Sequence, residues 1–204
     1  NLRKLRDHVE LLADPIDGLG QQALYGAVVS LDVAVNASEG GTGDVNSPRL
    51  QCVWCRGSSL MPGELAAAVA AHRAWMEGSS AAANTAGQVV VGLPRPRLPT
   101  DLPDYATLNQ ALHAGVTPLE VRGTEMSIVR SVTTRYKVPG GGESYELLDT
   151  IKVTVSDFLA DDIALKMQAR FGGFKVAPDT DVPLPSRTAT PATIRKSIID
   201  WLRQ

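Results

Sequence analysis

Residues 115–171 read GVTPLEVRGTEMSIVRSVTTRYKVPGGGESYELLDTIKVTVSDFLADDIALKMQARF, and this stretch decides the fold class that we predict. Its first half is rich in β-branched residues, which predicts strands at residues 119–121 and 126–138. Its second half predicts a helix over residues 156–171 with one apolar stripe packed on a core. The stripe residues recur four positions apart, at Leu159, Ile163, Met167 and Phe171.

The segments before this stretch alternate between helix and strand patterns. Apolar residues at helical spacing predict a helix over residues 2–13. Short apolar runs predict buried strands at residues 27–35 and 50–55 and a third run at 89–91. An Ala-rich helix is expected over residues 63–75, because Pro62 suits a helix start. Such alternation favours an α/β layer with parallel strands.

Glycine, proline and capping residues set the expected boundaries. Residues 36–47 predict a flexible loop, and the proline-rich residues 93–103 predict an irregular connector. A short helix over residues 105–114 should end at Gly115, and a last helix should begin at Pro191 with Thr190 as its N-cap. We therefore expect a mixed α/β fold with a layered sheet and packing helices, divided into subdomains at residues 1–98 and 99–204.

Composition narrows the functional classes. Charged residues make up 21% of the chain and the formal net charge is -2, without a block of Lys or Arg, which argues against nucleic-acid binding. The sequence holds no apolar run of the roughly 20 residues that a membrane-spanning helix needs. Two cysteines are too few for a disulfide-stapled secreted domain and fit a reducing cytoplasm.

The sequence supplies few candidates for chemistry. Cys52 and Cys55 form a C-x-x-C pattern, but strand residues three apart point to opposite faces, so a structural role is expected. The glycine loop at residues 40–43 lacks the Gly-Lys-Ser/Thr ending of a phosphate loop. Adjacent Asp161 and Asp162 suit the start of a helix better than a pair of catalytic carboxylates.

The histidines do not form a recognisable site either. Three histidines lie on separate helical segments without a recognisable Ser, Cys or carboxylate partner, at His8, His72 and His113. We assign no catalytic, cofactor-binding or metal-binding residue and no cofactor. An α/β enzyme domain, perhaps a hydrolase, stays open as the alternative, because a catalytic triad is assembled in space.

Several motifs occur in a fixed order over nearly the whole chain, namely residues 11–22 (LLADPIDGLGQQ), Arg49 followed by 62–71, residues 108–119 (LNQALHAGVTPL), 128–136 (IVRSVTTRY), 148–171 and 190–199. In this order the motifs resemble one protein family, the contractile tail sheath proteins of phages related to Mu. The family has an N-terminal portion and a C-terminal arm that are absent here. Since the chain begins at Asn1 without Met and ends inside a helical pattern, we expect a fragment cut at both ends.

The resemblance implies a structural protein of the virion, assembled in the host cytoplasm. Sheath subunits form hexameric rings stacked around a tail tube, between a baseplate and a tail terminator. Contraction drives the tube through the host envelope and leads to genome ejection, without any nucleotide or metal. No nucleic-acid or membrane partner is implied, and this fragment is expected to be monomeric. A tail-like bacteriocin or a secretion-system sheath would share the same fold.

The resemblance also implies where subunits meet. Extended arms of sheath proteins add strands to neighbouring sheets, and we expect a strand at residues 126–136 and its neighbour at 145–155 to receive them. The interface candidates are Met126, Ile128, Arg130, Thr133, Thr134, Arg135, Tyr136, Tyr145, Ile151 and Val153.

Overall fold

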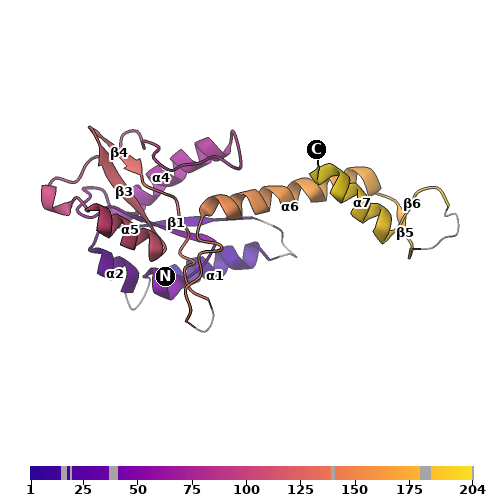
Figure 1. The fold of residues 1–204 in the computed structure, drawn as a ribbon, viewed down its shortest axis with the longest axis horizontal. Coiled ribbons are helices and arrows are strands. Elements are labelled where there is room, and N and C mark those ends of the chain that lie inside the picture. Colours follow the sequence, from indigo (N-terminus) through magenta and orange to yellow (C-terminus); the bar gives the residue numbers. More distant parts are fainter. Residues whose placement is uncertain (15–17, 19, 37–40, 139–140, 180–184, 204) are drawn as a thin grey trace. The chain divides into compact units, whose positions relative to one another are not determined.

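The computed structural model describes residues 1–14, 18, 20–36, 41–138, 141–179 and 185–203 (Figure 1). The chain divides into two compact units, Asn1–Val155 and Ser156–Gln204. The expected boundary at residues 98 and 99 falls within the first unit, whose sheet takes strands from both sides of it. As a division between sheath subdomains, that boundary stays a prediction.

The first unit is built on a 4-stranded mixed sheet in the order β1-β2-β3-β4. The strands are β1 (Ala23–Ala27), β2 (Leu50–Trp54), β3 (Val116–Arg122) and β4 (Glu125–Ile128). The pairs β1–β2 and β2–β3 are parallel, as the alternating sequence pattern predicts, whereas β3 and β4 form an antiparallel pair.

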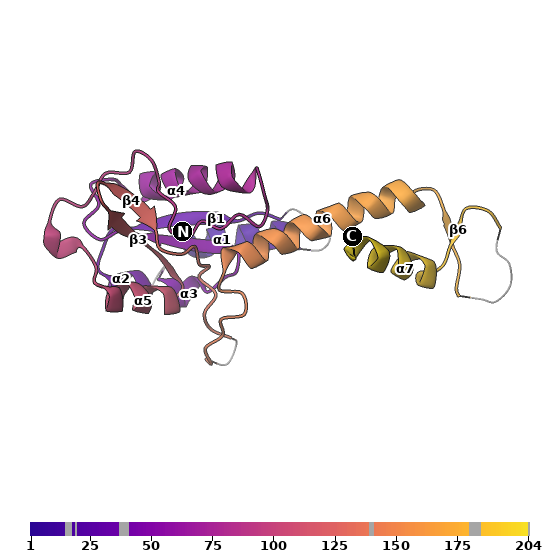
Figure 2. The ribbon, with the colours of Figure 1, turned by 45° about the horizontal axis from the view of Figure 1, so that its top comes forward.

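Helices cover both faces of this sheet (Figure 2). The helix α4 (Pro62–Glu77) lies on one face. The opposite face is covered by α1 (Leu2–Leu12), α2 (Leu31–Asn36), α3 (Thr42–Val45) and α5 (Tyr105–His113). Side chains alternate between the two faces of a strand, so the sheet has a hydrophobic core on each face. Cys52 and Trp54 of β2 point toward α2 and α5, while Val53 packs with Leu65 and Val69 of α4.

The second unit contains the later part of α6 (Thr150–Phe171), the short parallel pair β5 (Lys175–Val176) and β6 (Thr188–Ala189), and α7 (Pro191–Leu202). The predicted cap is confirmed, because the Thr190 hydroxyl accepts a hydrogen bond from the Thr193 amide. The ammonium of Lys166 lies 3.7 Å from the ring centroid of Trp201, which joins α6 to α7. The stripe residues of α6 are only half-buried within this unit.

Several predicted elements are confirmed with small shifts, namely those at α1, β2, α4, α5 and α7. Other predicted strands are wrong in position or extent. The expected strand at residues 27–35 ends at Ala27, and α2 begins at Leu31. An apolar run can lie on a helix as well as on a strand, and Leu31 and Ala34, three residues apart, both reach the core.

The expected strands around residues 126–155 are also wrong in extent. The strand β4 ends at Ile128, and the following residues make only isolated bridges such as Val132 with Asp149. The helix α6 begins at Thr150, so Ile151 and Val153 are helical instead of extended. Residues 89–91 make one bridge, between Val89 and Ser127, without forming a strand.

The expected loop at residues 36–47 contains the single-turn helix α3, and residues 37–40 lie outside the described part of the chain. The proline-rich connector contains only one 3-10 turn, Pro99–Asp101. None of the helices in the described ranges is both long and apolar enough to cross a membrane.

Candidate assembly surface

The predicted interface motif SVTTRY binds the beginning of β2 through its backbone and its hydroxyls. The Thr134 amide donates to the carbonyl of Leu50 at 2.8 Å. The Thr134 hydroxyl accepts from the Ser47 amide at 2.9 Å and donates to the Ser47 carbonyl at 3.1 Å. One residue earlier, the Thr133 hydroxyl donates to the carbonyl of Leu147 at 2.7 Å. The motif therefore holds distant parts of this same unit together.

The predicted interface residues fall into two groups by burial. The buried group lies in the interior of the first unit: Met126, Ile128, Thr133, Thr134, Tyr136 and Val153. The group with partly or fully exposed side chains consists of Arg130, Arg135, Tyr145 and Ile151. Only this second group can offer side chains to a neighbour without unpacking the unit. Their role at a subunit interface stays a prediction.

A bidentate ion pair joins the two ends of segment 130–149, which carries most of these residues. The guanidinium of Arg130 donates to both carboxylate oxygens of Asp149, at 2.7 and 2.8 Å. The Thr133 amide donates to the Leu148 carbonyl at 2.6 Å beside this pair. At the far end, the ring of Tyr145 contacts the ring of His113 on α5, with centroids 5.2 Å apart.

The outer edge of β4 is already covered. The amides of Gly87 and Val90 donate to the carbonyls of Ile128 and Met126, at 2.7 and 2.9 Å. The amide of Ile128 donates to the carbonyl of Gln88 at 2.9 Å. Because these groups already have partners, this geometry does not favour addition of a strand at residues 126–128.

The opposite edge of the sheet, at β1, is open. The Ala23 amide donates to the Arg49 carbonyl, and the Ala27 carbonyl accepts from the Cys55 amide. The backbone N–H and C=O groups of every second residue of β1 therefore point toward β2. The backbone groups of Leu24 and Gly26 therefore face outward, and no described residue bonds them. Sequence reasoning missed this edge, although a glycine inside a strand often marks a close backbone approach.

A groove of about 500 Å³ runs beside the open edge of β1. Small and apolar residues of α4 form its far wall: Pro62, Gly63, Ala66, Ala67 and Ala70. Leu2, at the start of α1, and Gln22, just before β1, complete the lining with residues of β1 itself. Extended polypeptide is the kind of ligand that satisfies a bare strand edge in such a groove.

A polar network ties α4 to the sheet behind this groove. Arg73 is 3% exposed and donates to Gln51 of β2, to Gln22 and to Glu77. Gln51 in turn donates to the hydroxyl of Thr117 on β3 at 2.9 Å. A buried guanidinium needs such partners, because an unpaired buried charge is strongly unfavourable.

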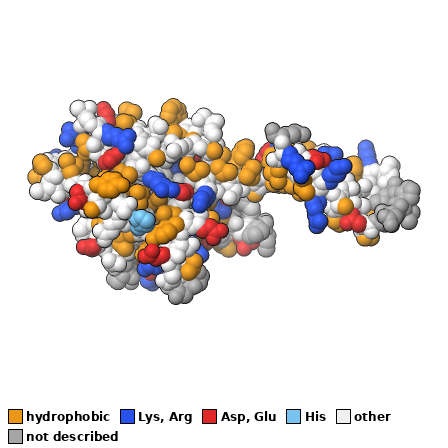
Figure 3. Space-filling model, in the orientation of Figure 1, with side chains coloured by type: hydrophobic (Ala, Val, Ile, Leu, Met, Phe, Trp, Pro, Cys, Tyr) orange, Lys and Arg blue, Asp and Glu red, His pale blue; other side chains and the backbone are white. Residues whose placement is uncertain are grey.

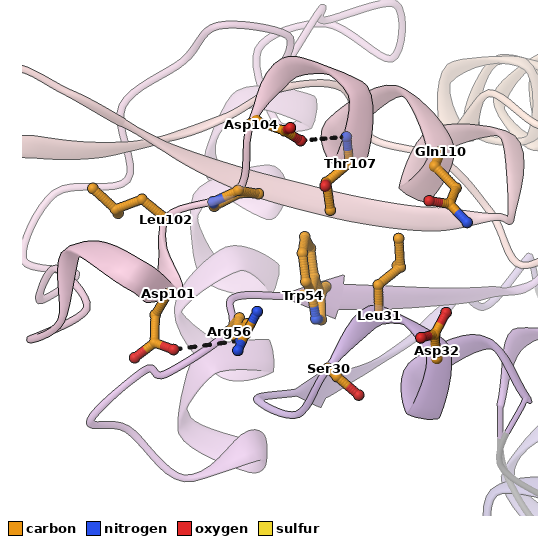
Figure 4. A pocket seen from close by; sticks show the side chains of 11 residues that line it. Ser30, Leu31, Asp32, Trp54, Arg56, Asp101, Leu102, Asp104, Thr107 and Gln110 are labelled. Carbon is orange, nitrogen blue, oxygen red and sulfur yellow. Dashed lines mark hydrogen bonds and ion pairs between the residues drawn. The ribbon is translucent and has the colours of Figure 1, made fainter.

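A second pocket, of about 400 Å³, lies beyond the carboxyl end of β2 and provides a test of the enzyme alternative (Figure 4). Its ionisable lining residues are Asp32, Arg56, Asp101 and Asp104. Arg56 pairs with Asp101 at 3.4 Å. Asp104 caps α5 by accepting from the Thr107 amide at 2.8 Å. Hydrogen bonds from the side chain and the backbone of Thr107 lower the pKa of the Asp104 carboxyl.

The lining of this pocket does not assemble a nucleophile with a base. The indole of Trp54 donates to the Val29 carbonyl at 2.8 Å, which fixes the indole orientation. The lining contains no His or Cys, and Ser30 is its one serine. Two of its three aspartates are committed to Arg56 and to the helix cap, so the geometry gives the enzyme alternative no specific support.

The two cysteines are free and lie in the interior. As predicted from strand alternation, Cys52 packs with Trp54 on one face of the sheet and Cys55 packs with Val53 and Leu65 on the other. Burial raises the pKa of the Cys52 thiol to about 12 and that of Cys55 to about 11. Neither is a thiolate at neutral pH, so neither is a ready nucleophile.

The charges on the surface are mixed. Figure 3 shows Lys and Arg side chains interspersed with Asp and Glu on the visible face, with hydrophobic side chains between them. Within the described residues, no group of three or more His, Cys, Asp or Glu side chains could hold a metal ion.

Comparison with known proteins gives matches by structure alone, since no family model and no curated protein sequence matches the chain. One similar structure is the sheath tail protein from Desulfitobacterium hafniense, with a TM-score of 0.57 and 14% identity over 82% of this chain. Another is a chain of the anti-feeding prophage (AFP) baseplate, with a TM-score of 0.60 and 11% identity over 98% of this chain. The chain has a tail-sheath-like fold. It spans 36% of the first matched protein and 48% of the second.

Proposed function

We propose that this chain is part of a structural subunit of a contractile tail sheath, of the type found in phages related to Mu. The observation that carries the proposal is the structural similarity, which extends over 82% and 98% of the chain for two components of tail or tail-like assemblies. The ordered sequence motifs support the same family. The arrangement of the site agrees with it, because the described residues offer exposed apolar side chains more clearly than a catalytic constellation.

In this function the intact subunit forms hexameric rings that stack around a tail tube, between a baseplate and a terminator. The stored energy lies in contacts between subunits that have two alternative arrangements, so contraction needs no cofactor. The chain is then a fragment that lacks the terminal arms which link subunits. It works in the virion of a phage, or in a related tail-like particle, after assembly in the host cytoplasm.

The assembly state of two protein lengths tests the proposal. Light scattering of the 204-residue chain should give the mass of a monomer, because on this proposal the chain lacks the arms that link subunits. The longer natural protein should form tubes that are visible by electron microscopy. Stable rings or tubes of the short chain, or a longer protein that never assembles under any condition, would contradict the proposal.

A further inference from the structure

The open edge of β1 presents backbone groups that need a partner. The N–H and C=O groups of Leu24 and Gly26 face the groove, and a row of unpaired backbone groups is a template for one more strand. The opposite edge of the sheet, at β4, is covered by residues 87–90. Among the described residues, the sheet therefore lacks a neighbour on the β1 side only.

The shape of the groove selects a single extended strand as its occupant. Gly26 lies so close to the beginning of α4 that an added Cβ atom would be 2.0 Å from the Pro62 carbonyl oxygen. The first turn of α4 therefore packs directly against β1 at Gly26 and forms one wall of the groove. Gly63 has no side chain and Ala66 and Ala67 have small ones, which leaves space for large apolar side chains on an incoming strand.

The position of α1 indicates where this strand comes from. Leu2, the first residue of α1, lines the same groove as Leu24 and Gly26. The helix then packs Leu5 and Val9 against Ala23 and Tyr25 on one face of the sheet, and the chain continues into β1. A strand placed directly before α1 would complete a β-α-β unit, whose right-handed crossover sets that strand parallel and adjacent to β1.

We propose that the residues directly preceding Asn1 in the full-length protein form a strand that pairs in parallel with β1 and fills this groove. This inference rests on the proposed function in one respect, namely that the chain is part of a longer subunit. The strand belongs to the same polypeptide, so it is present before any assembly. The β1 edge is then an internal part of the subunit and is closed to the arms of neighbouring copies.

Backbone amide exchange in two protein lengths tests the proposal. In the longer protein, kept monomeric at low concentration, the Leu24 and Gly26 amides should exchange about 100-fold more slowly than in the 204-residue chain. The Tyr25 amide faces β2 and serves as an internal control that should be protected in both. Protection that appears only after assembly, or that never appears, would overturn the proposal. A natural protein that starts at Asn1 would overturn it as well.

A pair of substitutions on α4 gives a second measurement. Ala67 lines the groove and is exposed in the short chain, whereas Ala71 is exposed on the same helix outside the groove. Ala67→Glu should lower the Tm of the longer protein by about 5 °C and leave the short chain nearly unchanged. Ala71→Glu should have little effect in either length. Equal effects of the two substitutions would contradict a strand in the groove.

These results are separable from the proposed function. Slow exchange at Leu24 and Gly26 in a longer protein that never forms tubes would support the strand and refute the sheath. Tubes formed by a longer protein whose β1 amides stay unprotected as a monomer would support the sheath and refute the strand.

Discussion

The hydroxyl of Thr134 makes two hydrogen bonds with the backbone of Ser47, accepting from its amide at 2.9 Å and donating to its carbonyl at 3.1 Å. Both residues are fully buried, and 87 positions of sequence separate them. The SVTTRY motif, which is part of the sequence resemblance to sheath proteins, therefore joins distant segments inside the first unit. Its threonines act through hydroxyl groups that satisfy buried backbone atoms.

Removing this hydroxyl should destabilise the chain. Thr134→Val keeps the shape of the side chain but leaves the Ser47 amide and carbonyl without this partner, at an expected loss of about 2 kcal/mol of unfolding free energy. Urea unfolding measures the change. Thr124→Val, at an exposed turn position, is the matched control and should change stability by less than about 0.5 kcal/mol. Equal effects at both positions would show that the hydrogen bonds between Thr134 and Ser47 do not contribute to the unfolding free energy.

Glycine at position 26 should be irreplaceable, in contrast to a glycine nearby. A Cβ atom on Gly26 would lie 2.0 Å from the Pro62 carbonyl oxygen, so Gly26→Ala must displace β1 or α4 and should cost about 3 kcal/mol. Gly63 has nothing within 4 Å of its added Cβ and lies in a helix, so Gly63→Ala should stabilise by about 0.5 kcal/mol. Thermal unfolding of both variants measures the contrast, and a well-tolerated Gly26→Ala would refute the close approach.

The buried guanidinium of Arg73 should be important for stability. Arg73→Met leaves Gln51 and Glu77 without their donor and should cost about 3 kcal/mol in urea unfolding. Arg97→Met, at an exposed position, provides the control and should be close to neutral. A neutral Arg73→Met would mean that the network is dispensable.

The cysteines should be unreactive in the folded chain. Folding raises the pKa of Cys52 from 9.0 to about 12, so the folded state holds this proton more tightly than the unfolded state. This contribution to stability is fully present below about pH 9 and is lost as pH rises toward 12. A thiol reagent at pH 8 should modify the cysteines only after urea is added. Rapid modification without urea would contradict the burial of both thiols.

Elements with strong local signals could be predicted from the sequence. Pro62 at the first position of α4, Thr190 as the cap of α7 and Gly115 after α5 each set a boundary for a local chemical reason. Predictions were wrong where the local sequence is compatible with both a strand and a helix. The alternating residues 151–155 favour a strand, yet Thr150 and Val153, three positions apart, are both buried and the segment is helical.

The candidate site was less predictable because it depends on pairing between distant segments. Which strand lies at an edge is decided by its neighbours, so the cover that residues 87–90 give to β4 has no signature in the sequence of β4. Likewise, the bare edge of β1 follows from its place in the sheet. The one local clue was Gly26, whose missing side chain permits the approach of α4.

Electron microscopy of the full-length natural protein tests most directly whether this chain is part of a tail sheath subunit. A tail sheath subunit should form tubes of stacked rings with six subunits per ring, and the four-stranded sheet and α4 of the first unit should fit the density of each subunit in a reconstruction. A protein that stays dispersed under every assembly condition, or an assembly whose subunit density does not accommodate this unit, would contradict the assignment as a tail sheath subunit.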